Sequence, residues 1–129
     1  MTPDVLAPFA NADGFLPHLP GLPEAINADS FDEDVLESPV PVLVEFWTAR
    51  CASCRRLAPL LQSVAGENNV RVFTVDVDAE LPAAVRFGVQ SVPQVLLFAG
   101  GTVRGRLVGV PDRAAITAFL RENRPEPKE

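Results

Sequence analysis

The two cysteines of this 129-residue chain, Cys51 and Cys54, are separated by two residues. A pair at this spacing can form a disulfide, and its thiolate can attack the disulfide of another molecule. The same spacing also serves zinc sites, but a structural zinc site takes four nitrogen or sulfur ligands. The single histidine, His18, lies far away in a proline-rich stretch, where we expect a surface loop. We therefore expect redox chemistry and no metal, with a pair of inert cysteines as the alternative.

The residues around the pair predict that it lies where a buried strand passes into a helix. An apolar run rich in β-branched residues begins at Val42, which is typical of a strand buried on both faces. After the cysteines, apolar residues recur with the period of an amphipathic helix, at Leu57, Leu60, Leu61 and Val64. The unpaired N–H groups and dipole of a helix start favour a thiolate at Cys51, and three arginines add positive charge, namely Arg50, Arg55 and Arg56. Cys51 would attack a partner's disulfide, and Cys54, one turn further on, would release the partner.

The segment Phe46-Trp47-x-x-x-Cys51-x-x-Cys54-Arg55-x-x-Ala58-Pro59 resembles the active-site segment of the thioredoxin family. The resemblance covers about residues 26 to 123 and also includes Asp29-Ser30-Phe31-x-x-x-Val35-Leu36, Pro93 with its following apolar run, and Gly109. It implies an α/β thioredoxin fold, a central mixed β-sheet flanked by helices on both faces. It also implies a thiol-disulfide oxidoreductase that reduces or exchanges protein disulfides through Cys51 and Cys54.

The same resemblance suggests roles for other residues. Glu45 occupies the place of a buried family aspartate that is thought to accept the proton of the second cysteine; an exposed or salt-bridged glutamate is the alternative. Pro93 would follow a cis peptide bond beside Cys51, with the Val92 backbone pairing with the substrate chain, although an ordinary trans proline could also open a strand. Gly109 would leave room for that chain, or simply end a strand. We add Trp47, an aromatic against the active-site loop, to the substrate-binding residues.

The chain departs from the family around the cysteines. Where thioredoxins usually have Trp-Cys-Gly-Pro-Cys, this chain has Arg50-Cys51-Ala52-Ser53-Cys54. We expect Ala52 and Ser53 to tune the redox potential, since the Ser53 hydroxyl can stabilise a Cys51 thiolate and make the pair less reducing. Arg50 is either a solvated charge or a guanidinium that tunes Cys51 or selects acidic partners. Thr74 stands where thioredoxins often have a lysine that interacts with this carboxylate, so no lysine takes part in the proton path from Glu45 at that position.

Periodicity and turn residues predict the remaining elements. The first half of the chain should form a short strand at Ala25–Asn27, a helix capped by Asp29 or Ser30 that runs to about Glu37, and a helix from about Cys54 to residue 66 or 68. A strand at 70–77 and a helix at 80–87, ended by Gly88, follow. The last elements are strands at 92–98 and 103–108, joined by Gly100-Gly101, and a helix capped by Asp112 that buries Ile116, Phe119 and Leu120. We divide the chain into a proline-rich extension at 1–25, a domain at 26–123 and a charged tail at 124–129. The extension is either a poorly ordered arm or a segment packed on an apolar surface.

Composition and charge limit the partners. The net charge of -6 argues against nucleic acid and membrane surfaces, no apolar run reaches the length of a membrane span, and the first residues lack the features of a signal peptide. We expect a cytoplasmic monomer without a cofactor, acting on disulfide-containing client proteins and reduced by a thioredoxin-reductase-like or other thiol donor. In that compartment a cysteine pair is more often catalytic than structural. A binding module or holdase chaperone with little redox turnover is the main alternative, and a dimer bridging an iron–sulfur cluster is a weaker one.

Overall fold

The computed structural model describes residues 24–26 and 28–123, so the proline-rich extension, apart from Glu24 and Ala25, and the charged tail lie outside the described residues. The elements are, in chain order, β1 (Glu24–Ala25), α1 (Ala28–Phe31), a π-helical turn η2 (Asp32–Leu36), β2 (Val42–Trp47), α2 (Ala52–Asn68), β3 (Arg71–Asp76), α3 (Leu81–Arg86), β4 (Gln94–Ala99), β5 (Thr102–Val108) and α4 (Arg113–Asn123). Among the described helices, none is long and apolar enough to cross a membrane.

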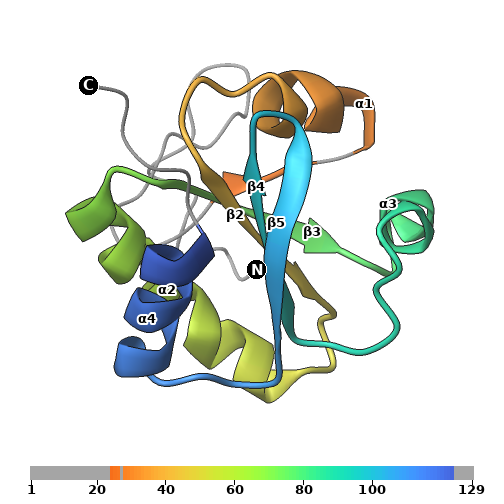
Figure 1. The fold of residues 1–129 in the computed structure, drawn as a ribbon. Helices are drawn as coiled ribbons and strands as arrows, with labels where there is room; N and C mark the ends of the chain where they lie inside the picture. Colours follow the sequence, from red (N-terminus) through yellow and green to blue (C-terminus); the bar gives the residue numbers. More distant parts are fainter. Residues whose placement is uncertain (1–23, 27, 124–129) are drawn as a thin grey trace, which may run out of the picture.

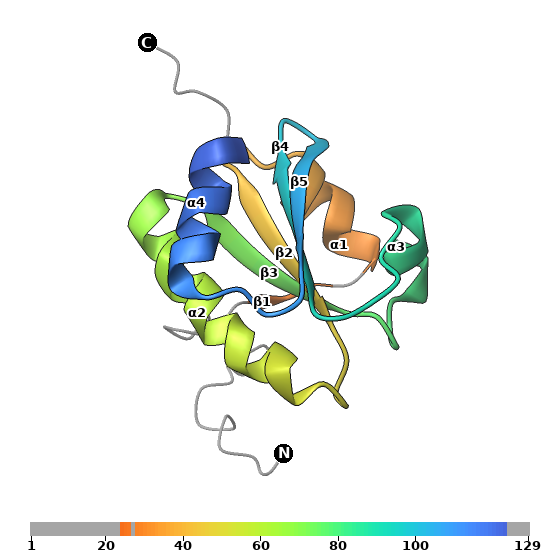
Figure 2. The same ribbon diagram turned by 60° about the horizontal axis from the view of Figure 1, so that its bottom comes forward.

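The five strands form one mixed sheet in the order β1-β3-β2-β4-β5. β2 lies at its centre, parallel to β3 and antiparallel to β4. Its residues 42–46 are all buried, as expected for a strand covered on both faces. Helices α2 and α4 cover one face of the sheet, while α1 and α3 cover the other (Figures 1 and 2). The predicted architecture, a mixed sheet between two layers of helices, is confirmed.

Two apolar clusters fill the space on either side of the sheet. The cluster under α2 and α4 joins Leu43 of β2 to both helices and includes Leu57, Leu61, Ile116, Phe119 and Leu120. On the other face, the rings of Phe31, Phe87 and Phe98 pack with centroids 5.1–5.5 Å apart. Each fully buried side chain of this size contributes about 1.5–3 kcal/mol, so these clusters fix the two helix layers on the sheet.

Several predicted boundaries were wrong: β3, α3, β4 and β5 differ by one or two residues at one or both ends, and the first helix, the first strand and α2 differ as well. The first helix begins at Ala28, so Asp29 and Ser30 both lie inside it and neither is its N-cap. The first strand is Glu24–Ala25, and the N–H of Ile26 adds a further bond to β3 by donating to the Thr74 carbonyl at 2.9 Å. Helix α2 begins at Ala52, two residues before the expected start, because Cys51 takes the N-cap position.

Other local predictions are confirmed. Gly88 follows α3 with φ 69°, and Gly100 and Gly101, with φ 61° and 84°, form the tight turn between β4 and β5. The Asp112 carboxylate accepts a hydrogen bond of 2.8 Å from the Ala115 N–H and so caps α4. Glycine readily adopts the positive φ values that the turns require, and aspartate supplies the acceptor that the helix start requires.

β5 is an edge strand that contains a bulge. Leu97 pairs with Gly105 and Phe98 pairs with Val103, so Arg104 is an extra residue on β5. Next to the bulge, Gly105 allows α4 to approach closely, since a Cβ atom there would lie 2.8 Å from the Asn123 Oδ1 atom.

Candidate active site

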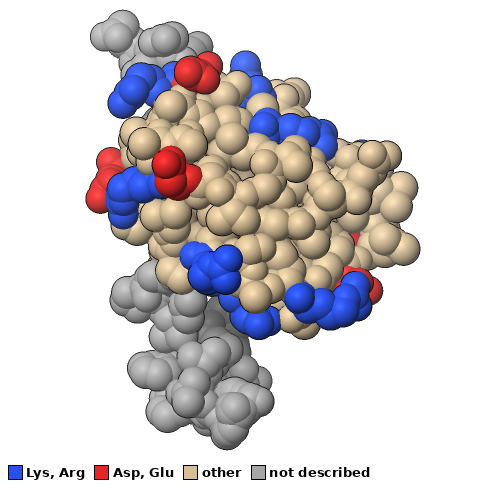
Figure 3. All heavy atoms as spheres, turned by 90° about the horizontal axis from the view of Figure 1, so that it is seen from below, with Lys and Arg blue, Asp and Glu red and all other residues tan. Residues whose placement is uncertain are grey.

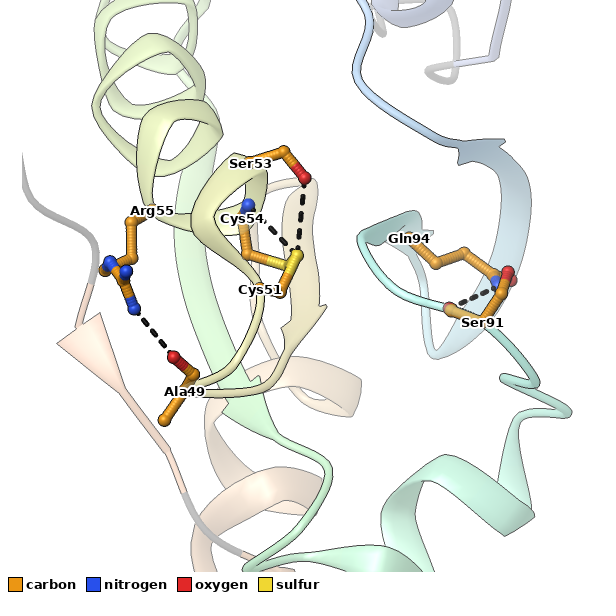
Figure 4. Close-up of a disulfide and its surroundings, with 7 residues drawn as sticks. All are labelled: Ala49, Cys51, Ser53, Cys54, Arg55, Ser91 and Gln94. Atoms are coloured by element: carbon orange, nitrogen blue, oxygen red, sulfur yellow. Dashed lines mark hydrogen bonds between the residues drawn. A yellow bond between two sulfur atoms is a disulfide. The ribbon is translucent and has the colours of Figure 1, made fainter.

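The two cysteines lie in the turn between β2 and α2 and form a disulfide (Figure 4). β2 ends at Trp47, and the Cys51 N–H donates to the Thr48 carbonyl at 3.1 Å, which closes the turn. Cys51 is half-buried at the N-cap of α2, whereas Cys54 is only 1% exposed, and their Cα atoms are 5.3 Å apart. The predicted arrangement is confirmed: Cys51 is partly exposed at the start of the helix, and Cys54 is buried within its first turn.

The Cys51 sulfur contacts two polar groups of the first helical turn. It accepts a hydrogen bond of 3.2 Å from the Cys54 N–H and lies 3.4 Å from the Ser53 hydroxyl oxygen (Figure 4). In the reduced protein both groups would stabilise negative charge on this sulfur, together with the dipole of the helix. Ala52 is the first helical residue and is exposed, so it adds no polar contact.

Three arginines surround this turn. Arg50 forms an exposed ion pair with Asp78, with 3.4 Å between Nη1 and Oδ2. Arg55 donates from Nη1 to the Ala49 carbonyl at 2.7 Å and so braces the loop before Cys51 (Figure 4). The side chain of Arg56 is exposed, and within the described part of the chain it has no ion-pair partner.

Glu45 is a buried carboxyl group in the central strand, with 1% of its surface exposed. Because side chains alternate along a strand, Glu45 faces the same side as Leu43, which is the side covered by α2. Burial raises the pKa of Glu45 to about 8 from its ordinary 4.5. One carboxyl oxygen, Oε2, has no hydrogen-bond partner among the described residues, and the strand neighbour Thr74 is also buried. The structure therefore contradicts the alternative of an exposed or salt-bridged glutamate.

The loop before β4 carries the predicted cis-proline. The Val92–Pro93 peptide bond is cis, as predicted, and the Pro93 carbonyl accepts a hydrogen bond of 3.0 Å from the Gly109 N–H. Gly109 has φ 96°, and a Cβ atom there would have no neighbour within 4 Å. The loop segment around Ser91 and the start of β4 lies across from the disulfide (Figure 4). The open space at Gly109 is compatible with the approach of a substrate chain.

The other predicted substrate-binding residues are only partly buried. Trp47 is half-buried at the end of β2, next to Asp76 of β3, and its indole N–H has no acceptor among the described residues. Val92 is also half-buried and packs against the cluster around Phe31. Trp47 lies at the end of β2 that leads into the cysteine turn, and Val92 lies two residues before β4. Both are partly exposed apolar groups that can contact a bound chain.

Sequence reasoning missed one pair of residues that supports this loop. Gln94 is 3% exposed, accepts a hydrogen bond of 2.6 Å from Arg106 and donates one of 3.2 Å to the Ser91 carbonyl. Arg106 also donates to the Phe87 carbonyl at 2.9 Å. A glutamine inside the apolar run from Val92 to Phe98 was the available signal, because a buried amide needs hydrogen-bond partners.

Taken together, a mixed sheet between two helix layers, with a half-buried cysteine disulfide-bonded to a buried one at a helix N-terminus, defines a thiol–disulfide oxidoreductase. The Thioredoxin family model matches residues 23–122. The chain belongs to the thioredoxin family, and it is a protein-disulfide oxidoreductase with a thioredoxin fold.

Relatives and solved structures agree with this assignment. The chain is 42% identical over 100 residues to a thioredoxin of Mycolicibacterium smegmatis, covering 74% of this chain and 89% of that protein. It is also 42% identical over 93 residues to a bifunctional thioredoxin reductase/thioredoxin of Mycobacterium leprae (strain TN), which covers 70% of this chain and 20% of that protein. The structure of a mutant thioredoxin from Halobacterium salinarum NRC-1 superposes with a TM-score of 0.74 at 26% identity, covering 87% of this chain and 99% of that one.

Proposed function

We propose that Cys51 is the nucleophile and Cys54 the resolving cysteine of a cycle that reduces or exchanges disulfides in client proteins. In the reduced protein, the Cys51 thiolate attacks one sulfur of the client disulfide, and the other client sulfur leaves as a thiolate that takes up a proton. Cys54 then loses its proton and attacks the Cys51 sulfur, which breaks the mixed disulfide and releases the client. The client has gained two electrons and two protons, and the Cys51–Cys54 disulfide of the structure is the product.

One observation carries this assignment of roles. Cys51 is a half-buried residue whose sulfur has two donors for a thiolate, the Cys54 N–H at 3.2 Å and the Ser53 hydroxyl at 3.4 Å, whereas Cys54 is buried. A client disulfide can therefore reach only the sulfur that is best prepared to attack. The buried sulfur reacts second, within the molecule, where its effective concentration is high.

Glu45 accepts the proton of Cys54 in this proposal. It faces the α2 side of the sheet, and its pKa of about 8 is close to the operating pH, which suits a group that takes up and returns a proton. Glu45→Gln should slow the release of clients from mixed disulfides while leaving the first attack by Cys51 largely intact. Equal slowing of both steps in stopped-flow measurements would contradict this role.

The substrate-binding surface consists of Trp47, Arg50, Val92, Pro93 and Gly109. The backbone of Val92 pairs with an extended client segment, and Gly109 leaves space for it, in agreement with the open surroundings at its Cα. Ala52 and Ser53 set the redox potential, and the Ser53 contact favours the reduced form of the pair. The pair should be less reducing than in ordinary thioredoxin; an equilibrium titration against glutathione that gives an equal or lower potential would contradict this.

A thiol donor returns the two electrons that each cycle consumes. A thioredoxin-reductase-like protein is the donor we propose, since one relative is named as a bifunctional thioredoxin reductase/thioredoxin. We further propose that the chain works in the cytoplasm as a monomer, without a bound cofactor, in cellular redox homeostasis. Its net charge of -6 gives no reason for nucleic acid or membrane as a partner.

Trapping is the decisive experiment. The Cys54→Ser variant keeps the nucleophile but cannot resolve the mixed disulfide, so it should accumulate clients that a thiol reductant releases. The Cys51→Ser variant is the matched control and should trap none. Disulfide reduction that is unchanged in Cys51→Ser would contradict the proposal and favour a binding module or holdase.

A further inference from the structure

Three of the basic residues of this acidic chain lie next to the reactive disulfide in the sequence. The chain has 17 acidic and 11 basic residues, yet three of the basic ones lie within the seven positions from 50 to 56, where there is no acidic residue. We call Arg50, Arg55 and Arg56 the arginine collar. Of these three arginines, Arg55 is the one whose side chain braces the cysteine turn, through its hydrogen bond to the Ala49 carbonyl.

The collar is exposed and open to new partners. The Arg50 side chain is 78% exposed and that of its partner Asp78 is 50% exposed, and an ion pair of this kind contributes little and exchanges readily. Arg55 uses one of its five N–H donors on the Ala49 carbonyl. Arg56 has no ion-pair partner among the described residues. Figure 3, which views the end of the molecule where α2 begins, shows basic side chains around a mainly uncharged face, with acidic ones at its margins.

The acidic residues that lie nearest to the collar in the fold are Asp76, at the end of β3 beside Trp47, and Asp78. Asp78 pairs with Arg50, so within the described part of the chain Arg55 and Arg56 keep their charge unpaired. The acidic run Asp32, Glu33 and Asp34 belongs to η2, which lies away from the first turn of α2 (Figure 1). Charges separated by more than about 8 Å are largely screened at physiological ionic strength. Glu45, the acidic residue nearest in sequence to the collar, is buried in the sheet and does not lie on the exposed surface that carries the collar. A segment that approaches Cys51 therefore meets positive charge.

We propose that the arginine collar selects client proteins whose disulfide is flanked by Asp or Glu. Guanidinium groups bind carboxylates through paired hydrogen bonds, and complementary charge raises the rate of encounter. This inference rests on the proposed function and specifies its substrate class. If the arginines acted only by stabilising the Cys51 thiolate, they would accelerate attack on all disulfides equally, whatever their charge.

Three synthetic peptides with the same disulfide test the proposal. The residues next to the cysteines are two Glu in the first peptide, two Gln in the second and two Lys in the third. Single-turnover reduction by the pre-reduced full chain should be about tenfold faster for the Glu peptide than for the Gln peptide at low ionic strength, and slowest for the Lys peptide. The differences should shrink toward unity in 1 M salt, where the Debye length is about 3 Å.

Two variants with the same charge change locate the effect. Arg56→Gln should lower the Glu-to-Gln rate ratio about threefold. Arg121→Gln, in the last turn of α4, should leave the ratio unchanged. Equal rates for the three peptides would overturn the proposal, and so would a drop of the rate ratio in Arg121→Gln as large as that in Arg56→Gln. In either case, reduction of the Gln peptide would still support the dithiol cycle. Failure to reduce any of the peptides would contradict the proposed function and this inference with it.

Discussion

Arg106 of β5 and Gln94 of β4 are joined by a hydrogen bond of 2.6 Å between Nη1 and Oε1. Through this bond the edge strand supports the loop that precedes β4, because Gln94 also holds the Ser91 carbonyl and Arg106 holds the Phe87 carbonyl. The loop is thus fixed near both of its ends. The pair therefore positions the segment that lies across from the Cys51–Cys54 disulfide.

Replacing Arg106 by Ala should loosen this loop and weaken substrate binding. The change removes the donors to Gln94 and Phe87 and leaves the buried Gln94 Oε1 without its partner, at a cost of about 1–3 kcal/mol. We expect KM for a peptide disulfide to rise about threefold or more and kcat to change less. Hydrogen exchange at residues 87–92 should become faster.

Arg104→Ala is the matched control for this prediction. Arg104 lies on the same strand and has the same charge, but its side chain contacts the Ala99 carbonyl at the other end of β4. An equal rise of KM in both variants would show that charge, and not support of the loop, is responsible.

The buried Glu45 should make stability depend on pH. Its carboxyl group loses its proton near pH 4.5 in the unfolded chain and at about pH 8 in the fold. Between these values the folded state binds more protons, so the free energy of unfolding falls as the pH rises, by up to about 1.4 kcal/mol per pH unit. Glu45→Gln should remove this slope in the oxidised protein. Urea titrations between pH 5 and 8 that show the same slope in both proteins would contradict the prediction.

Ser53→Ala should make Cys51 a poorer nucleophile at neutral pH. The variant loses the hydroxyl that lies 3.4 Å from the Cys51 sulfur, a contact worth about 0.5–1.5 kcal/mol to the thiolate. The rate of Cys51 alkylation in the reduced protein at pH 7 should fall about two- to tenfold. Ser53→Thr keeps a hydroxyl and should restore most of the rate, and no loss in Ser53→Ala would refute the role of Ser53.

Two glycine-to-alanine changes should have opposite effects on stability. Gly109 has φ 96°, which strains any residue with a Cβ, so Gly109→Ala should destabilise the fold by about 1–2 kcal/mol although there is space for the methyl group. Gly66 lies inside α2 with open space around it, so Gly66→Ala should stabilise the fold by about 0.5–1 kcal/mol. Chemical denaturation gives both values, and changes of the same sign would contradict the reasoning.

Local sequence signals predicted most of the fold. The apolar run from Val42 to Trp47 indicated a strand covered on both faces, and Gly100-Gly101 and Asp112 marked a turn and a helix start, because each of these features depends on a few neighbouring residues. Similarly, the two-residue spacing of Cys51 and Cys54 indicated where their sulfurs would lie, since both belong to one helical turn.

Contacts between distant parts of the chain could not be predicted in this way. The bond between Gln94 and Arg106 crosses two strands, and its geometry depends on the bulge at Arg104. Arg50 pairs with Asp78 only because parallel strands β2 and β3 end at the same edge of the sheet. Such pairs need the register of the sheet, which the residue pattern of a single strand does not contain.

The bulged edge strand has a consequence for the protein at high concentration. β5 has a neighbour on one side only, and an exposed row of backbone groups is a template for pairing with another molecule. The extra residue at Arg104 interrupts the regular spacing of these groups, and Arg104 and Arg106 bring two like charges to the edge. Pairing of two copies through their β5 edges would bring these like charges together. The bulge and the two arginines therefore disfavour aggregation through this edge.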